Sequence, residues 1–308
     1  MRHVSLVLAL TTAGCFCGTD LDEATRASAQ VEGKRTRPPE TWREHWFEHR
    51  QVVKLVAFND EVAIYFDDDM PREALKWIEP FLTKAWPYTK KTYGTFGPDA
   101  RLFAIFHQGK YGGGHPSTYF DESHDHRNVI DCGADTWDQS RLDMVSHEIG
   151  HIVEGASNGV HESPAFDIWS DSKWIELYQY DLYVALELDR EARRAGQKFT
   201  RQADDFPRPG THWFRDFFHP LWREHGRARL MANFFSLLAR NFPQEPEHGG
   251  KHQRYTRRMN WGEFILFMSR AAGEDVRPVA KKAFGWPAEW EELYQKARMD
   301  FPGVRRIR

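Results

Sequence analysis

The sequence SHEIGHIVEG, residues 146–155, constrains this 308-residue chain more than any other stretch. It lies within a segment whose apolar residues recur at spacings of three and four, which predicts a helix with one buried face. These residues are Leu142, Val145, Ile149, Ile152 and Ala156. Thr136 and Gln139 have the spacing of a capping box at the start of this helix, and Gly155 is a candidate stop.

The same helix carries His147, Glu148 and His151. Side chains four residues apart lie about 5–6 Å from each other at Cβ. Two imidazoles at that spacing can bind one cation, with Zn–N bonds of about 2.0–2.1 Å. Glu148 lies in the neighbouring sector, where its carboxylate can take a proton from a zinc-activated water that attacks a carbonyl. The pattern therefore predicts a zinc site with Glu148 as general base, rather than two core histidines beside a surface acid.

A catalytic zinc needs a third protein ligand. Glu176 lies 25 residues after His151, early on the next predicted helix, and is the ligand we expect. Asp171 lies 20 residues after His151, at a helix start where an N-cap role is the simpler interpretation. His161 lies 10 residues after His151, in a predicted loop. Asp171 and His161 remain alternatives, because zinc accepts carboxylate and imidazole alike.

With these residues the chain resembles the zincin metallopeptidases, and its closest match is their gluzincin branch. That branch has H-E-x-x-H on one helix and a glutamate ligand on a following helix, often near a tryptophan, as Glu176 is near Trp174. The resemblance implies a Zn²⁺-dependent hydrolase of peptide bonds. His147, His151 and Glu176 would hold the metal, and Glu148 would be catalytic.

The sequence also departs from zincin patterns. The metzincin branch continues its motif with a glycine and a third histidine, where this chain has Glu154 and Ser157. The spacing to Glu176 is longer than in the thermolysin and aminopeptidase families, whose spacing would put the ligand near Ser170 or Asp171. The resemblance covers mainly residues 102–188.

The remaining patterns predict an α+β fold, with strands before the motif and helices after it. A hairpin turning at Asn59 and Asp60 is expected in residues 51–67, and strands are expected at 100–108 and 128–132. A helix over 71–94 contains Pro80 and Pro87, which predict a kink or two shorter helices. Residues 109–126 are expected to form a loop, 172–196 one long helix, and 212–302 further helices. We therefore divide the folded part into a zincin-like catalytic region with a small mixed sheet, 41–200, and a mainly helical C-terminal part, 201–308.

The N-terminus resembles an export signal. Arg2 precedes the apolar VSLVLAL of residues 4–10, which is too short to span a bilayer. TTAGC, ending at Cys15, resembles a bacterial lipobox, although Thr12 stands where leucine is commonest. We expect a signal peptide over 1–14, a disordered tether over 15–40, and either a lipid anchor on Cys15 or simple secretion.

Composition limits the other classes of function. The formal net charge of −3 does not favour a nucleic-acid partner, and the three cysteines build no disulfide framework.

We expect a monomer that acts on a peptide or protein and touches a membrane only through Cys15. The substrate would lie along the strand at 129–132. Candidates for stabilising the oxyanion are Tyr180, His212, His219 and Tyr255. The rival hypothesis is a zincin-like binding lipoprotein for a glycan or cell-wall ligand, without hydrolytic activity.

Overall fold

The structure, a computed structural model, describes residues 36–44, 51–171 and 173–304. The predicted signal peptide and Cys15 lie outside the described residues, as does most of the predicted tether. Residues Pro38–Arg308 form one compact unit. Among the described residues, no helix is both long and apolar enough to cross a membrane.

A mixed six-stranded sheet precedes the motif, as the sequence predicts. Its strands are β1 (Thr41–Arg43), β2 (Val52–Phe58), β3 (Val62–Phe66), β4 (Leu102–Gln108), β5 (Gly113–Ser117) and β6 (Asn128–Ala134), in the order β1-β2-β3-β4-β6-β5. The hairpin β2–β3 turns at Asn59, whose Oδ1 accepts hydrogen bonds from the backbone N–H groups of Glu61 and Val62 at 2.8 and 3.0 Å. Strands β3, β4 and β6 are parallel, because the chain returns between them through crossovers.

Strand β5 corrects the prediction of a loop over 109–126. It pairs antiparallel with β6, with Gly113 opposite Gly133 and Ser117 opposite Val129. Its sequence, GGHPS, lacks the β-branched and aromatic residues that mark strands. Pairing with β6 supplies the stabilisation instead, and Pro116 is tolerated because β5 is the edge of the sheet.

The two faces of the sheet differ, because side chains alternate along each strand. Ile64, Ala104 and Ile130 face the main core, together with helices α2 (Leu75–Tyr93) and α3 (Leu142–Ala156). Tyr65 and Phe103 face a smaller core that contains Trp42. Helix α2 runs unbroken through Pro80 and Pro87, rather than as two helices, and ends at Gly94, where φ is 101°.

Helix α3 has the predicted apolar stripe, and all five of its residues are buried. Its start differs from the prediction. Asp138, not Thr136, accepts a hydrogen bond from the backbone N–H of Ser140 and begins a short 3-10 turn, η3 (Gln139–Arg141), that leads into α3. The helix ends at Ala156, one residue after Gly155.

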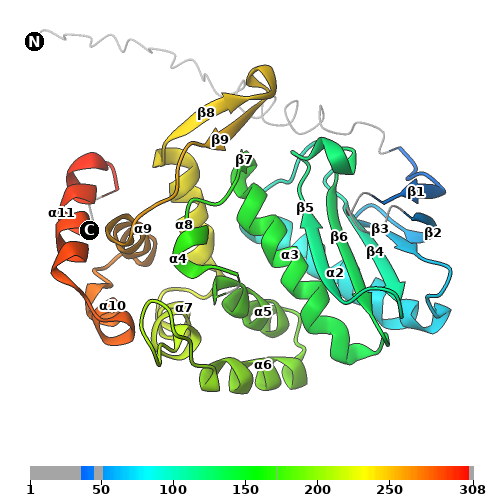
Figure 1. Cartoon of the computed structure of the whole chain (residues 1–308), viewed down its shortest axis with the longest axis horizontal. Helices are drawn as coiled ribbons and strands as arrows, with labels where there is room; N and C mark the ends of the chain where they lie inside the picture. Colours follow the sequence, from blue (N-terminus) through cyan, green and yellow to red (C-terminus); the bar gives the residue numbers. More distant parts are fainter. Residues whose placement is uncertain (1–35, 45–50, 172, 305–308) are drawn as a thin grey trace, which may run out of the picture. The chain divides into compact units, whose positions relative to one another are not determined.

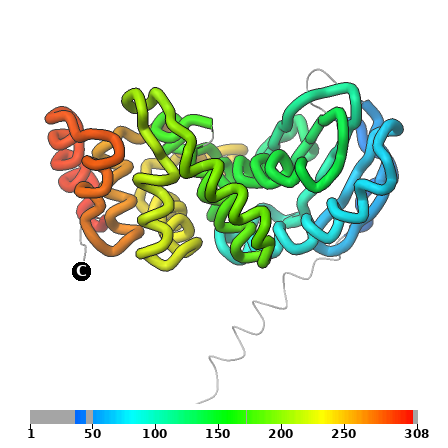
Figure 2. Tube along the Cα trace, turned by 90° about the horizontal axis from the view of Figure 1, so that it is seen from below, coloured from blue at the N-terminus to red at the C-terminus, as the bar shows by residue number. Residues whose placement is uncertain are grey.

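Helices dominate the remainder, as predicted (Figures 1 and 2). They are α4 (Phe166–Trp169), α5 (Lys173–Ala185), α6 (Asp189–Arg201), η5 (Phe214–Phe218), α7 (His219–Glu224), α8 (Ala228–Asn241), α9 (Trp261–Ala272), α10 (Arg277–Phe284) and α11 (Ala288–Asp300). The expected long helix over 172–196 is two helices, because the chain reverses at Glu187, which has a φ of 58°. The protein is thus α+β.

A second, three-stranded sheet was not predicted. Strand β7 (Val160–His161) pairs in parallel with β9 (His252–Tyr255), which pairs antiparallel with β8 (Gln244–Glu247). The hairpin β8–β9 projects beyond α8 in Figure 1. Its strands, QEPE and HQRY, are too polar to show an alternating pattern, so only the pairing with β7 reveals them.

Candidate metal centre

His147 and His151 converge with Asp171 at one point beside α3. The two Nε2 atoms lie 3.1 Å apart, and the imidazole rings are nearly perpendicular, with an interplanar angle of 81°. Asp171 Oδ1 lies 3.3 Å from His147 Nε2 and 3.1 Å from His151 Nε2. One donor atom from each residue therefore falls within 4.8 Å of the others, a spacing at which the three residues could hold one metal ion.

The turn after α4 brings Asp171 to this point. Helix α4 ends at Trp169, and Ser170 has a φ of 52°, a left-handed conformation that residues other than glycine rarely adopt. Such conformations cost about 1–3 kcal/mol and concentrate at functional sites. The Asp171 side chain is 59% exposed, against 26% and 16% for His147 and His151, so the site opens to solvent on the Asp171 side.

Glu176, the expected third ligand, lies elsewhere. Its Oε1 accepts a hydrogen bond from Gln202 Nε2 at 2.8 Å and lies 3.5 Å from Lys173 Nζ. Trp174 and Leu177 pack into the core, as the helix pattern predicts. Burial raises the pKa of the Glu176 carboxyl to about 7. The structure therefore groups the alternative, Asp171, with the histidines, and not Glu176.

His161, the other alternative, is also outside the group. It lies on β7, where its Nδ1 is 2.8 Å from Glu247 Oε2 and its ring stacks on Phe120 at a centroid distance of 4.6 Å. These contacts fix the imidazole on the second sheet rather than against α3.

Glu154 contacts the ring nitrogen of His151 that faces away from His147 and Asp171. The sequence does not single out this residue as part of the site. Its Oε2 lies 3.4 Å from His151 Nδ1, while its Oε1 accepts hydrogen bonds from Ser163 Oγ at 2.8 Å and Trp169 Nε1 at 2.5 Å. A carboxylate on one ring nitrogen of a histidine orients the other nitrogen for a metal. The spacing of three residues between His151 and Glu154 on one helix was the available signal.

The side chain of Glu148, on α3, lies against the edge strand β5. A Cβ atom added to Gly114 would come within 2.2 Å of Glu148 Oε1, so only glycine lets the carboxylate approach the strand this closely. Burial raises the pKa of Glu148 to about 7, and the charges of Asp171 and Asp131 act in the same direction. Burial also lowers the pKa of His147. A carboxyl with a pKa near neutrality is suited to exchanging protons at neutral pH.

The position of β5 corrects the expectation that a substrate lies along 129–132. That segment belongs to β6, which is already paired with β4 on one side and with β5 on the other. Within the part of the chain that the structure describes, β5 pairs only with β6. The strand edge nearest to Glu148 is therefore that of β5.

A cavity of about 310 Å³ lies next to the group. Its wall includes His151 and Glu154 on α3, Ser117 on β5, Phe166 on α4, and Arg258 in the segment before α9. Arg258 donates a hydrogen bond to the backbone oxygen of Ser163 and lies 3.4 Å from Glu162 Oε2.

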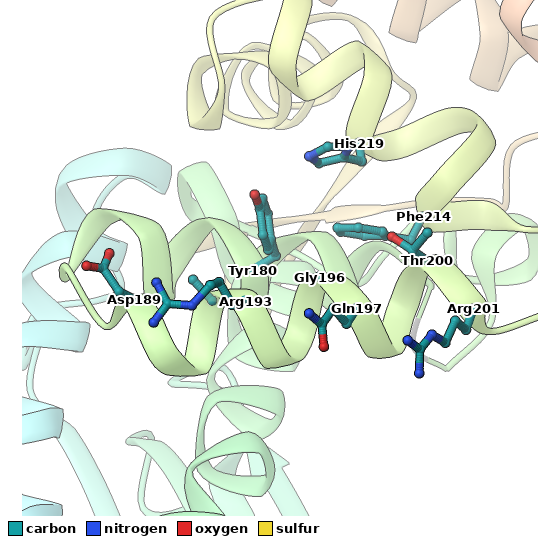
Figure 3. Close-up of a pocket in the computed structure, with 10 residues that line it drawn as sticks. Tyr180, Asp189, Arg193, Gly196, Gln197, Thr200, Arg201, Phe214 and His219 are labelled. Atoms are coloured by element: carbon teal, nitrogen blue, oxygen red, sulfur yellow. The ribbon is translucent and has the colours of Figure 1, made fainter.

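A larger cavity, of about 550 Å³, lies between α5, α6 and η5 (Figure 3). The rings of Tyr180 and His219 lie 5.3 Å apart at its wall. These two residues were candidates for stabilising an oxyanion, and neither lines the cavity beside His151. Tyr255, a third candidate, is buried on β9 beside Phe242. No contact between the fourth candidate, His212, and the two histidines is seen in the described residues.

No family model matches the chain, and no curated protein matches it. Among solved structures it is similar to the crystal structure of a functionally unknown conserved protein from Bacillus anthracis str. Ames, at 11% sequence identity and a TM-score of 0.45. The alignment covers 77% of this chain and 50% of the other chain, so this chain spans about half the length of that protein.

Proposed function

We propose that this protein is an exported, zinc-dependent metallopeptidase. The observation that carries the proposal is the convergence of His147, His151 and Asp171 beside the buried Glu148. Two imidazole nitrogens and one carboxylate oxygen are a donor set found in catalytic zinc sites. The support of His151 by Glu154 fits the same assignment, because histidines that bind metals commonly donate their other N–H to a carboxylate.

In this proposal His147, His151 and Asp171 would hold Zn²⁺, and Asp171 takes the place first assigned to Glu176. Zinc bound there would polarise a carbonyl group and lower the pKa of water toward about 7. Glu148 would accept the proton of the attacking water and pass it to the leaving amine. Glu148 is buried next to His147 and His151, where a carboxylate can carry out both proton transfers.

The substrate backbone would pair with the edge of β5. An extended peptide can add a strand to an exposed sheet edge through backbone hydrogen bonds, while pockets receive alternate side chains. The cavity beside His151 would receive one of these side chains, because Ser117 of β5 forms part of its wall. A peptide in this position would pass Glu148, which lies against Gly114 of the same strand.

Export remains an inference from residues 1–15. A lipid anchor on Cys15 would keep the enzyme in the cell envelope, and simple secretion would release it. In either case the substrate would be an extracytoplasmic peptide or protein, and the enzyme would act as a monomer.

The rival function, a binding lipoprotein without hydrolytic activity, has one observation in its favour. The larger cavity combines an aromatic wall of Tyr180, Phe214 and His219 with the polar side chains of Arg193 and Gln197, a lining suited to a sugar (Figure 3). A binding lipoprotein without hydrolytic activity would have no use for Glu148 beside the two histidines.

Metal analysis combined with a peptide-library digest tests the proposal. The purified protein should carry about one zinc per chain, and chelation should stop cleavage. Glu148→Gln should keep the zinc and lose roughly two to four orders of magnitude in rate, because the base is removed and the ligands stay. His147→Ala should lose zinc and activity together. Cleavage by metal-free protein, or zinc loss in Glu148→Gln, would contradict the proposal.

A further inference from the structure

Three histidines from two distant segments meet on the surface of the protein. His126 follows η2 (Glu122–His124), while His248 and His252 belong to the turn and the second strand of the hairpin β8–β9. The ring centroids of His126 and His248 lie 6.3 Å apart, and those of His248 and His252 lie 6.2 Å apart. The HDH sequence of residues 124–126 thus has a partner that the linear sequence does not indicate.

These three side chains are available to a ligand. His126 and His248 are exposed, and His252 is partly buried. Within the described ranges, none of the three imidazoles takes part in a hydrogen bond or an ion pair. The other histidines near this surface differ in this respect, since His161 is bound to Glu247 and His124 to Ser123.

His252 is the best fixed of the three. Its ring packs edge-on against Phe120 at 5.1 Å and Tyr119 at 5.7 Å. Burial lowers its pKa, and the neighbouring His248 and His126 lower it further. The two aromatic contacts hold the His252 imidazole in place beside His248.

The backbone at the other two positions is unusual. His126 has a φ of 54° and His248 a φ of 48°, both in the left-handed region that non-glycine residues rarely occupy. Two of the three histidines therefore stand at positions where glycine or asparagine would be less strained. The two turns place the imidazole of His248 between those of His126 and His252, in ring contact with both.

We propose that His126, His248 and His252 form a second metal site, for a transition-metal ion such as Zn²⁺ or Cu²⁺. Imidazole ligands suit these ions and disfavour Mg²⁺ and Ca²⁺, which require oxygen. With metal–nitrogen bonds of about 2 Å, the rings around such an ion have centroids roughly 5 Å apart. The centroid separations of 6.3 and 6.2 Å exceed this value by about 1 Å, so the exposed imidazoles of His126 and His248 would have to close in for an ion to bind.

An ion at this site would join the η2 segment to the hairpin β8–β9. Asp121, at the start of the η2 segment, lines the cavity beside His151. On the other side, β9 pairs with β7, whose His161 lines the same cavity. The second site therefore connects two walls of that cavity. It uses no residue of the His147–His151–Asp171 group, so it does not depend on the proposed peptidase activity.

The test removes the first site and titrates the second. The full chain with His147→Ala and His151→Ala is titrated with Zn²⁺ at pH 7.5 by calorimetry. We expect one equivalent to bind, at least tenfold more weakly after His126→Ala or His248→Ala. The matched control His219→Ala, a histidine of the other cavity, should change nothing. With Cu²⁺, the electron paramagnetic resonance spectrum should show coupling to more than one imidazole nitrogen.

Two outcomes would overturn the site. One is an absence of zinc binding by the His147→Ala, His151→Ala protein. The other is binding that survives both His126→Ala and His248→Ala, which would place the metal on other residues, such as the buried group Glu44, His107 and Asp131. Since His126 and His248 are exposed, both variants should fold, and their melting temperatures without metal provide the check.

Discussion

Asp171 Oδ1 lies 3.1 Å from His151 Nε2, although the two residues are 20 positions apart and belong to different segments. The turn that follows α4, in which Ser170 has a φ of 52°, leads into Asp171 and its carboxylate. In the proposed zinc site, this contact assigns the third ligand to Asp171, and that assignment is testable.

Asp171→Asn should weaken zinc binding by more than the roughly 10–100-fold typical of a residue that only supports a ligand. The substitution preserves the shape and removes the charge. Glu176→Gln and His161→Ala are the matched controls, and both should bind zinc like the wild type. Competition with a chromophoric chelator measures the affinities. Tight binding by Asp171→Asn together with zinc loss in Glu176→Gln would return the assignment to Glu176.

Glu154→Gln should reduce zinc affinity by roughly 10–100-fold, because His151 loses the carboxylate that orients its ring. Glutamine can still accept from Ser163 or Trp169, so folding should be largely kept. Glu162→Gln is the control, since Glu162 lines the same cavity without contacting His151. Equal affinities for the two variants would show that Glu154 has only a structural role.

Glu176 should make the apo protein less stable as pH rises. Its pKa is about 7 in the folded state, above the ordinary value of 4.5, so the folded protein holds a proton that the unfolded chain releases. The contribution to stability is present below pH 4.5 and is lost as pH rises to about 7, by on the order of 3 kcal/mol. Glu176→Gln should lose less free energy of unfolding than the wild type between pH 5 and pH 8 in urea titrations. If the free energy of unfolding falls equally with pH in the wild type and in Glu176→Gln, the loss of stability does not come from Glu176.

Cys15→Ala should release the protein from membranes if Cys15 carries lipid. Stable anchoring requires more than one acyl chain, so the lipidated wild type should need detergent for extraction. Fractionation of cells, with N-terminal sequencing of the mature protein, measures both properties. Wild-type protein in the medium, with an N-terminus other than residue 15, would indicate simple secretion.

The sequence by itself determined the local features of the site. The period of 3.6 residues places His147 and His151 on one side of α3 and the apolar stripe on the other, whatever the rest of the fold does. The turn at Asn59 and the end of α2 at Gly94 follow in the same way from patterns a few residues long.

Only the tertiary structure decided which distant groups join these residues. Glu176 and Asp171 both follow α3 at plausible spacings, and the reversal at Ser170 turns Asp171 toward α3 while Glu176 contacts Gln202. Strand β5 and the hairpin β8–β9 exist through pairing with neighbours far away in the sequence, because their own residues carry no strand pattern. The meeting of His126 with His248 depends on that hairpin, and a local pattern contains no information about a contact across 122 residues.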